Sequence, residues 1–300
     1  MFSHYLCEIT EAHTSPEACA ACARVRRFPE CPLVFPVVQA LTENRRPDDF
    51  GPTATDLIGC LRQKRLKIEV PYAVKPTSQF ALLRGNLFHS LLELKNTPEF
   101  LTEQRFSIPV ETPHGTAVVS GQVDLFDPLT GTLYDFKSTK RVPQARRVYT
   151  CPTTGALLHE GGYLRKFVDC SCGVRHNPRD IEALYTPEPY GNHVAQLSLY
   201  RVILEEQGYE VKKGLVVYLD MEQFLPLEIP FMSPADTWRF VEARVATWLQ
   251  PGLPAGVMDD PDQGWMCAYC PVRTECELRF SADALADAPT EAELLEALGF

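Results

Sequence analysis

Eleven cysteines are the feature of this 300-residue sequence that most limits what it can fold into. Their number is odd, and the chain opens without the basic and apolar segments of a secretory signal. Because disulfide frameworks are typical of small secreted proteins, metal or cluster ligation is the stronger interpretation. No uncharged apolar run approaches the roughly 18 residues of a membrane span. We therefore expect a cytoplasmic protein with no membrane partner.

The cysteines fall into four groups along the chain. The first group holds Cys7, Cys19, Cys22 and Cys31, and Cys60 stands alone. The third group holds Cys151, Cys170 and Cys172, and the last holds Cys267, Cys270 and Cys276. The C-x2-C-x5-C spacing of the last group is dense enough to wrap a metal ion or an iron–sulfur centre. It supplies three thiolates where four are required.

Two of the groups could form zinc sites. Cys19 and Cys22 are a C-x2-C pair to which His4 and Cys7 could add two ligands, with Cys31 and His13 as further candidates. Plain buried thiols explain this first group equally well. The third group could bind zinc with either His159 or His176, although C-x-C spacing is less usual. Such a site would order a basic loop.

Charge is unevenly distributed in this acidic chain. The net charge of −10 argues against a protein coated in basic surface. Four cations nevertheless lie within residues 62–67, and five lie within 137–147, whereas the last twenty residues carry five acidic groups and no cation. Because local stripes set the field that a phosphate chain meets, binding to nucleic acid is not excluded.

The hydrophobic pattern predicts alternating helices and strands. We expect helices over 53–69, 79–95, 191–207 and 234–250, and strands over 106–112, 117–127, 132–139 and 215–221. Residues 127–131 predict a hairpin turn. Residues 141–190, rich in Pro, Gly and Cys, look like an irregular insertion. This order predicts an α/β fold with a sheet flanked by helices. We place a Cys-rich extension at 1–50, the main domain at 51–280 and an acidic tail at 281–300.

The predicted hairpin carries the residues with the clearest chemistry. Asp124 lies on one strand and Asp135 on the next, and Lys137 shares the face of Asp135 because side chains alternate along a strand. Two carboxylates on neighbouring strands can hold hard divalent cations such as Mg²⁺ or Mn²⁺. A lysine beside them can position or deprotonate a water, or stabilise developing phosphate charge. Metal-assisted phosphodiester hydrolysis needs this set, although a solvated surface hairpin is the simpler alternative.

Two helical features add to the hairpin. His89 lies within an otherwise apolar helix, where its imidazole could complete a metal's coordination, or simply be a satisfied core side chain. Gln196 and Tyr200 are spaced i, i+4, so they share one helix face and could orient a strand or the lysine. Ordinary half-buried surface is the alternative for that pair.

Four short motifs follow one another in a recognisable order. They are G-x-x-x-H (Gly85, His89), G-x-V-D (Gly121, Asp124), D-x-K (Asp135, Lys137) and Q-x-x-x-Y (Gln196, Tyr200). Together they resemble the RecB-like branch of the PD-(D/E)XK nucleases, which implies a restriction-endonuclease-like core with a mixed central sheet. The resemblance implies metal ligation by His89, Asp124, Asp135 and the backbone carbonyl of Phe136. It makes Lys137 the catalytic lysine, with Gln196 and Tyr200 as its supporting pair.

The same resemblance supplies a fourth cysteine ligand. In RecB-like nucleases with an iron–sulfur cluster, that ligand comes from a helix upstream of the histidine motif, where this chain has Cys60. The resemblance, which extends to the CRISPR-adaptation exonucleases, implies one 4Fe–4S cluster on Cys60, Cys267, Cys270 and Cys276. This cluster would staple the C-terminal segment to the helix of Cys60. Zinc in the same four thiolates is the alternative.

These features predict a Mg²⁺- or Mn²⁺-dependent DNA nuclease, with exonuclease action on single strands or DNA ends favoured by the resemblance. The chain has no phosphate-binding loop for a motor, so a helicase or integrase could be its protein partner, in repair, phage replication or CRISPR adaptation. A non-catalytic iron–sulfur scaffold subunit that binds DNA is one alternative. A redox protein that uses the cluster itself is another, but it leaves the D-x-K hairpin unexplained.

Overall fold

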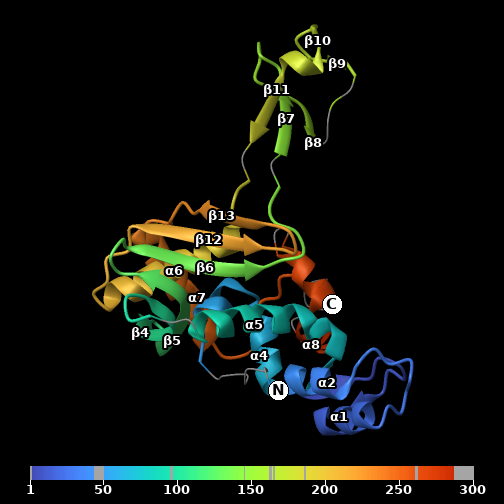
Figure 1. Cartoon of the computed structure of the whole chain (residues 1–300). Helices are drawn as coiled ribbons and strands as arrows, with labels where there is room; N and C mark the ends of the chain where they lie inside the picture. The colour runs from blue at the N-terminus through green and yellow to red at the C-terminus, as the bar shows by residue number, and fades with distance from the viewer. Residues whose placement is uncertain are drawn as a thin grey trace, which may run out of the picture. The chain divides into compact units, whose positions relative to one another are not determined.

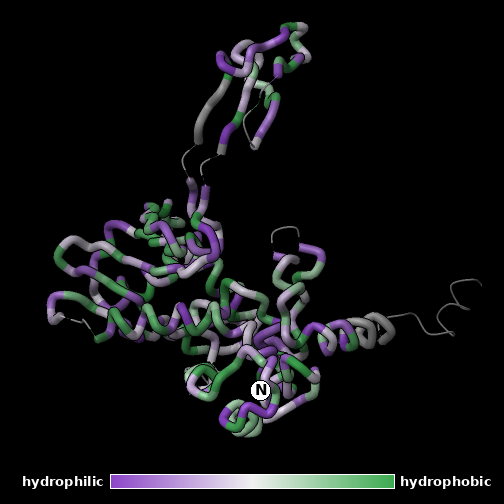
Figure 2. Tube along the Cα trace, turned by 45° about the vertical axis from the view of Figure 1, so that its right-hand side comes forward, coloured by the Kyte–Doolittle hydropathy of each residue, from purple (hydrophilic) through white to green (hydrophobic). Residues whose placement is uncertain are grey.

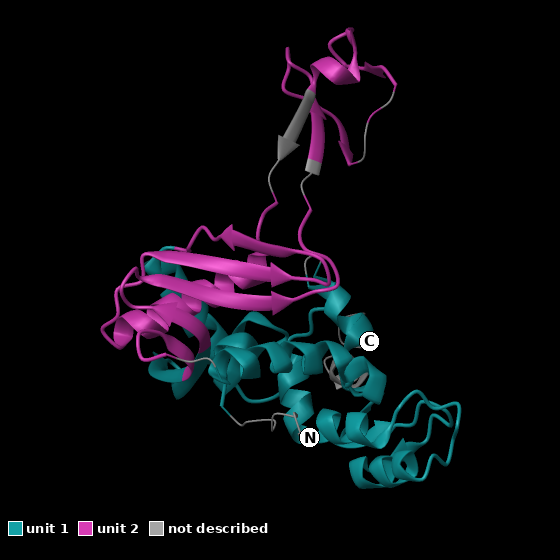
Figure 3. Cartoon of the chain, viewed as in Figure 1, with its two compact units in different colours: residues 1–95, 105–122, 233–300 teal, residues 96–104, 123–232 magenta. Residues whose placement is uncertain are grey.

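A computed structural model of the chain describes residues 2–43, 51–94, 97–144, 146–161, 164, 166–185, 187–260 and 263–286. Most of the expected acidic tail, residues 287–300, lies outside this part. The chain forms two compact units (Figure 3). Unit 1 comprises residues 1–95, 105–122 and 233–300, and unit 2 comprises 96–104 and 123–232. Each unit is therefore assembled from segments that are distant in the sequence.

A five-stranded mixed sheet, ordered β13-β12-β6-β5-β4, confirms the predicted α/β fold. Its strands are β4 (Leu101–Thr112), β5 (Gly115–Asp127), β6 (Thr132–Ser138), β12 (Lys213–Leu219) and β13 (Phe224–Glu228). β12 runs parallel to β6, whereas β13 is antiparallel to β12 and β5 is antiparallel to β6. Strand β13 was not among the expected strands. The sheet places the D-x-K strand β6 between β5 and β12.

The hairpin turn forms between β5 and β6 as predicted. The carboxylate of Asp127 accepts hydrogen bonds from the amide of Leu129 at 2.9 Å and the hydroxyl of Thr130 at 2.6 Å. Gly131 adopts φ +70°, and a Cβ there would lie 2.8 Å from the carbonyl oxygen of Glu210. Only glycine fits such a position without strain. These local contacts fix the register that brings Asp124 beside β6.

Helix α6 (Gly191–Glu206) lies along the β6 and β12 part of the sheet (Figure 1). It matches the helix expected over 191–207. Its middle is buried on all sides, with apolar residues that include Leu197, Leu199 and Ile203. The hydroxyl of Ser198 donates to the carbonyl of Val194 at 2.8 Å and accepts from the amide of Met232 at 3.0 Å. A helix buried in this way holds Gln196 and Tyr200 at fixed positions.

The helix expected over 53–69 is two helices in unit 1, α3 (Ala54–Ile58) and α4 (Leu61–Glu69). Gly59 is extended between them, and Cys60 is the N-cap of α4. The guanidinium of Arg244 donates to the carbonyls of Leu57, at 2.6 Å, and Gly59. These bonds satisfy carbonyls that a continuous helix would have used itself. Arg244 belongs to α7 (Pro234–Leu249), so local sequence could not reveal the break.

The rest of unit 1 surrounds these helices. The histidine-bearing helix α5 (Phe80–Leu94) follows the 3-10 turn η1 (Pro76–Gln79) close to its expected position. The N-terminal segment forms β1 (Phe2–Leu6), β2 (His13–Thr14), α1 (Pro16–Arg24) and α2 (Phe35–Glu43), and β3 (Tyr72–Val74) completes a small sheet ordered β2-β1-β3. The C-terminal segment forms η3 (Gly264–Tyr269) and α8 (Arg273–Ala286). Among the described helices, none combines the length and apolar character needed to cross a membrane.

The insertion is more regular than its composition indicates. It contains β7 (Arg146–Thr150), β8 (Leu157–Gly161) and β11 (Glu182–Tyr185) in the order β11-β7-β8, and the short hairpin β9 (Val168–Asp169) and β10 (Arg175–His176). A 3-10 turn, η2 (Pro178–Asp180), follows. Figure 2 shows hydrophilic stretches alternating with short apolar ones along this segment. So small a fold has little apolar core, and such folds usually need a further staple.

Candidate functional site

The two hairpin carboxylates are buried and adjacent in unit 2. Asp124 on β5 is 8% exposed and Asp135 on β6 is 1% exposed. The backbone amide of Phe136 donates a 2.8 Å hydrogen bond to Oδ2 of Asp124, which ties the acidic group of one strand to the backbone of the next. A buried carboxylate is costly unless it is paired or binds a cation. This burial separates the site from an ordinary solvated hairpin.

Lys137 forms an ion pair with Asp135, which lies two residues earlier on β6. Its Nζ lies 3.0 Å from Oδ1 and 2.8 Å from Oδ2 of Asp135. Burial acts to lower the pKa of Lys137, but the charges of Asp135 and Asp124 outweigh it and raise that pKa to about 12. Both oxygens of the buried Asp135 carboxylate therefore lie within 3.0 Å of the ammonium. An acceptor of this kind beside a second carboxylate suits ligation of a hard divalent cation.

Gln196 and Tyr200 meet each other next to the carboxylates. The side-chain amide of Gln196 donates to the hydroxyl of Tyr200 at 2.9 Å, and both residues are buried. Burial, together with the charges of Asp135 and Asp124, raises the pKa of Tyr200 to about 12. The Gln196–Tyr200 pair of α6 and the D-x-K strand therefore form one electrostatic cluster within unit 2. It is neutral at the helix and charged at the hairpin.

His193 is a member of this cluster that the sequence analysis missed. It lies one turn before Gln196 on α6, and its Nδ1 is 2.8 Å from the hydroxyl of Tyr218 on β12. Burial, reinforced by the positive charge of Lys137, lowers the pKa of His193 to about 4. The imidazole is therefore neutral near pH 7 and can orient without adding charge. Its spacing from Gln196 is common in helices and gives no sequence signal.

Glu103 is a second residue that the motifs did not identify. It lies on β4, and its carboxylate is within 4.8 Å of that of Asp124. Its φ of +52° is unusual for a residue with a side chain, and such strain is often found at functional sites. An acidic residue near the start of a strand carries no spacing signal. Glu103 therefore places a further carboxylate beside Asp124.

His89 lies on α5 in unit 1, where it is half-buried with its ring edge-on to Phe88 at 6.4 Å between centroids. A Cβ at Gly85, one turn earlier, would meet no atom within 4 Å. Close packing therefore does not explain the glycine of the histidine motif. The role of His89 as a metal ligand stays a prediction.

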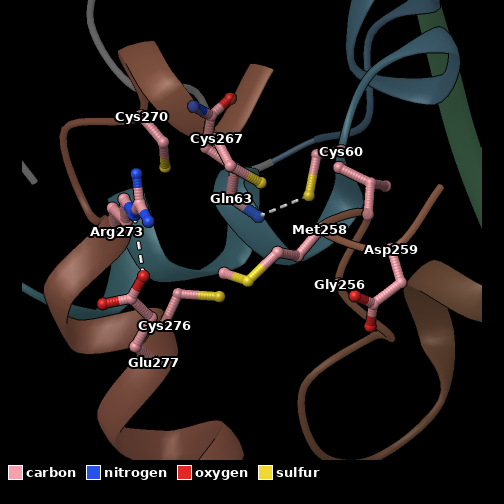
Figure 4. Close-up of a pocket in the computed structure, with 11 residues that line it drawn as sticks. Cys60, Gln63, Gly256, Met258, Asp259, Cys267, Cys270, Arg273, Cys276 and Glu277 are labelled. Atoms are coloured by element: carbon pink, nitrogen blue, oxygen red, sulfur yellow. Dashed lines mark hydrogen bonds and ion pairs between the residues drawn. The ribbon is translucent and has the colours of Figure 1, made fainter. Parts of the chain in front are cut away.

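The C-terminal cysteine set (Cys60, Cys267, Cys270 and Cys276) gathers in unit 1. All four line one cavity of about 180 Å³. Figure 4 shows their sulfur atoms directed towards a shared space, with Met258 and Arg273 beside it. Burial, followed by the charges of the other three thiols, raises the pKa of Cys267. The structure thus brings together residues more than 200 positions apart, as the sequence analysis expected for a single four-thiolate site.

Several contacts hold the C-terminal cysteine set in place. The amide of Gln63 donates to the sulfur of Cys60 at 3.4 Å, so this thiol caps α4. The buried guanidinium of Arg62 donates to the carbonyls of Pro254 at 3.3 Å and Cys276 at 3.4 Å. Cys270 and Cys276 also pack against a small apolar core that contains Val272. The donor set and its cavity fit a centre bound by four thiolates.

The insertion metal set (Cys151, Cys170, Cys172 and His176) could hold a metal ion. Its four ligand atoms all lie within 4.8 Å of one another. Cys151 Sγ is 3.7 Å from Cys172 Sγ, and His176 Nε2 is 3.4 Å from Cys151 Sγ and 3.9 Å from Cys172 Sγ. Sulfurs bound tetrahedrally to one zinc at about 2.3 Å lie about 3.8 Å apart. The side chains are therefore already arranged as around a single tetrahedral ion.

The backbone of the insertion is built around these ligands. Tight turns follow the cysteines, with Gly155 donating to the carbonyl of Cys151 at 2.8 Å and Gly173 donating to that of Cys170 at 2.9 Å. Both glycines adopt positive φ. His159, the alternative ligand, lies on β8 with its ring 5.8 Å from that of Tyr149 and is not in the set. The structure thus favours His176, a choice that the spacing left open.

Comparison with known proteins adds little. No model of a protein family and no curated protein matches the sequence. Among solved structures, the crystal structure of SSO0001 is similar over 80% of this chain and 93% of its own, at 17% identity and a TM-score of 0.48. At that level the similarity supports no argument about function.

Proposed function

We propose that this chain is a metal-dependent nuclease that hydrolyses phosphodiester bonds in DNA, of the RecB-like PD-(D/E)XK type, with single strands or DNA ends as its substrate. One observation carries the proposal: two buried carboxylates, Asp124 and Asp135, lie on neighbouring strands, and half-buried Lys137 forms an ion pair with Asp135 near the Gln196–Tyr200 pair. A structural ion pair needs Asp135 and Lys137, but it does not need a second buried carboxylate at the same place.

The carboxylates of Asp124 and Asp135 would hold the Mg²⁺ or Mn²⁺, with the carbonyl of Phe136 and His89 as further ligands predicted from the resemblance. Glu103, whose carboxylate neighbours that of Asp124, is a candidate for the same ion. The bound ion would polarise the scissile phosphate and lower the pKa of a water. The Lys137 ammonium lies 2.8 Å from Oδ2 of Asp135, so it would stand next to the ion and to the phosphate that the ion polarises.

The other residues of the cluster set the position and charge of Lys137. With a pKa near 12, its ammonium stays protonated at neutral pH and can offset the charge that develops on the phosphate. Tyr200, held by Gln196, stays protonated because its pKa is also near 12. Neutral His193 faces Lys137 from α6 without competing for the carboxylates. In this role His193, Gln196 and Tyr200 are positioning residues.

The two cysteine sites have structural roles in this proposal. The C-terminal cysteine set would bind a 4Fe–4S cluster that joins α8 to the start of α4, because its four thiols line one cavity. The insertion metal set would bind zinc, because its sulfur and nitrogen atoms already lie at tetrahedral spacing. Both centres would stabilise segments with small apolar cores.

The test is cleavage of single-stranded DNA labelled at one end, with Mn²⁺ or Mg²⁺, by anaerobically purified protein. We expect wild type to cleave and Lys137→Ala to lose cleavage with the visible absorbance of its cluster unchanged. Lys213→Ala is the matched control, because Lys213 forms an exposed ion pair with Glu228 at 2.9 Å on the same sheet. Equal cleavage by wild type and Lys137→Ala would reject the assignment. Absence of cleavage in wild type with DNA binding intact would favour the scaffold alternative.

A further inference from the structure

The first cysteine group lies in unit 1, outside both sites described above. Cys7 follows β1, Cys19 and Cys22 lie on α1, and Cys31 lies in the loop before α2. All four thiols, here called the N-terminal cysteine set, line one cavity of about 300 Å³. This is a larger space than the one enclosed by the C-terminal cysteine set. The thiols are half-buried, and none forms a disulfide.

Local structure aims these thiols at the common space. Ser15 caps α1 by accepting from the amide of Ala18 at 3.1 Å, and Cys19 and Cys22 then share one helix face at i, i+3. A tight turn holds Cys7, whose amide donates to the carbonyl of Ala12 at 2.9 Å. The amide of Cys31 donates to the carbonyl of Phe28 at 3.0 Å, which folds the loop back on the helix.

The thiols also interact with one another. Burial, followed by the charges of Cys22, Cys31 and Cys7, raises the pKa of Cys19 to about 11. At neutral pH the Cys19 thiol therefore stays protonated, and ionising it beside the other thiols without a cation carries an electrostatic cost. A thiophilic metal reverses this cost, because it replaces their protons and binds the thiolates.

The size of the surrounding core gives an independent reason for a staple. The buried apolar cluster beside α1 consists of Ala23, Leu33, Val38 and Leu41, with Cys19 and Cys31 packed against it. So few buried side chains supply little free energy of folding. Small segments of this kind usually depend on a disulfide or a metal, and these cysteines are free thiols.

We propose that Cys7, Cys19, Cys22 and Cys31 bind a thiophilic metal centre, either a zinc ion or an iron–sulfur cluster, that organises residues 2–43. Cys31 replaces His4 as the fourth ligand. His4 does not line the cavity, and its Nδ1 lies 2.8 Å from the hydroxyl of Ser3. His13 lines the cavity but is not needed where four thiolates are present. This centre is separate from the proposed catalysis and does not depend on it.

The experiment measures zinc, iron and acid-labile sulfide per chain in anaerobically purified full-length protein. Cys22→Ser and Cys31→Ser are compared with wild type and with the control His4→Ala. We expect both cysteine variants to lose either about one zinc or the iron and sulfide of about one cluster per chain, and His4→Ala to lose neither. Loss of zinc identifies an ion, and loss of iron with sulfide identifies a cluster. Unchanged content in both cysteine variants would overturn the proposal.

A second measurement uses only the wild type, in case the variants misfold. Folded protein is alkylated with N-ethylmaleimide before and after metal removal by 1,10-phenanthroline or by oxidative cluster disassembly and reduction, and the modified cysteines are mapped by mass spectrometry. We expect the N-terminal cysteine set to be protected as a group and to become reactive together. Reactivity of these four thiols before metal removal, or an intact mass showing disulfides between them, would overturn the proposal.

Discussion

The backbone amide of Phe136 donates a 2.8 Å hydrogen bond to the carboxylate of Asp124. Phe136, which lies between Asp135 and Lys137 on β6, therefore binds the carboxylate of Asp124 on the neighbouring strand β5. This bond orients the carboxylate of Asp124. It also couples the positions of both carboxylates, so a change at Asp124 acts on charge and on geometry.

Asp124→Asn separates those two effects. An amide oxygen can still accept from Phe136, so we expect the thermal stability to change little. The charge that would hold a divalent cation is lost, and several kcal/mol of transition-state stabilisation correspond to more than about a 100-fold loss of cleavage rate. Melting curves and cleavage time courses check this. Asp124→Ala should lose rate and stability together, and an Asn variant with near wild-type rate would contradict the role of the carboxylate.

His193 predicts a pH dependence of stability. Its pKa falls from about 6.5 in the unfolded chain to about 4 in the folded protein. Between these pH values the unfolded state binds more protons than the folded state. The folded protein therefore loses stability as pH falls from about 6.5 towards 4. Unfolding should require about 2 kcal/mol less at pH 5 than at pH 7 from this residue. Urea denaturation of wild type and His193→Gln at both pH values checks this, since the variant should lack that part of the decrease. An equal decrease in both proteins would refute it.

The insertion metal set predicts which histidine holds the metal. His176→Ala should lose about one zinc per chain and expose the insertion to proteolysis, because its Nε2 lies 3.4 Å from Cys151 Sγ. His159→Ala, at the alternative position on β8, should retain the metal. Elemental analysis and limited proteolysis measure both effects. Zinc retained in His176→Ala and lost in His159→Ala would reverse the assignment.

The insertion also carries a basic and aromatic surface. Residues 140–180 contain eight lysines and arginines against three acidic residues, whereas the rest of the chain contains 21 against 36. Phe167 is 57% exposed, and the guanidinium of Arg175 lies 5.8 Å from its ring centroid. Exposed aromatic rings and arginines are where single-stranded bases stack. We expect this surface to contact the substrate strand.

Phe167→Ala should therefore weaken binding of labelled single-stranded DNA by about 1–3 kcal/mol, or about 5- to 150-fold. Fluorescence anisotropy in a Lys137→Ala background measures affinity without cleavage. Phe224→Ala is the matched control, because that ring on β13 is 62% exposed and lies outside the basic segment. Equal affinities in the two variants would remove the insertion from the binding surface.

Local chemistry explains which parts of this fold the sequence predicts. The turn at 127–131 and the start of α7 at Ser233 depend on side chains within three residues, so pattern and capping suffice. The break at Cys60 depends on Arg244, which is 185 residues from Gly59, and no local pattern carries it. The strands of the insertion were missed because they are short and arranged around ligands rather than around an apolar core.

The same distinction holds for the candidate site. Asp124, Asp135 and Lys137 follow from strand alternation and one turn, and Gln196 with Tyr200 follows from helical spacing. Glu103 and His193 do not, because each reaches the cluster through tertiary packing alone. The proposal of Cys31 rather than His4 as the fourth ligand of the N-terminal cysteine set likewise depends on how the loop before α2 folds.

The central claim is that buried Asp135, in its ion pair with Lys137, supports metal-dependent cleavage of DNA. The most direct measurement is the Mn²⁺-dependent release of label from end-labelled single-stranded DNA by Asp135→Asn and by Glu228→Gln. Glu228→Gln is the control, because Glu228 also forms an ion pair with a lysine of this sheet, Lys213, but that pair is exposed. We predict that Asp135→Asn falls to the background rate and that Glu228→Gln cleaves as wild type does. Equal rates for Asp135→Asn and wild type would contradict the account.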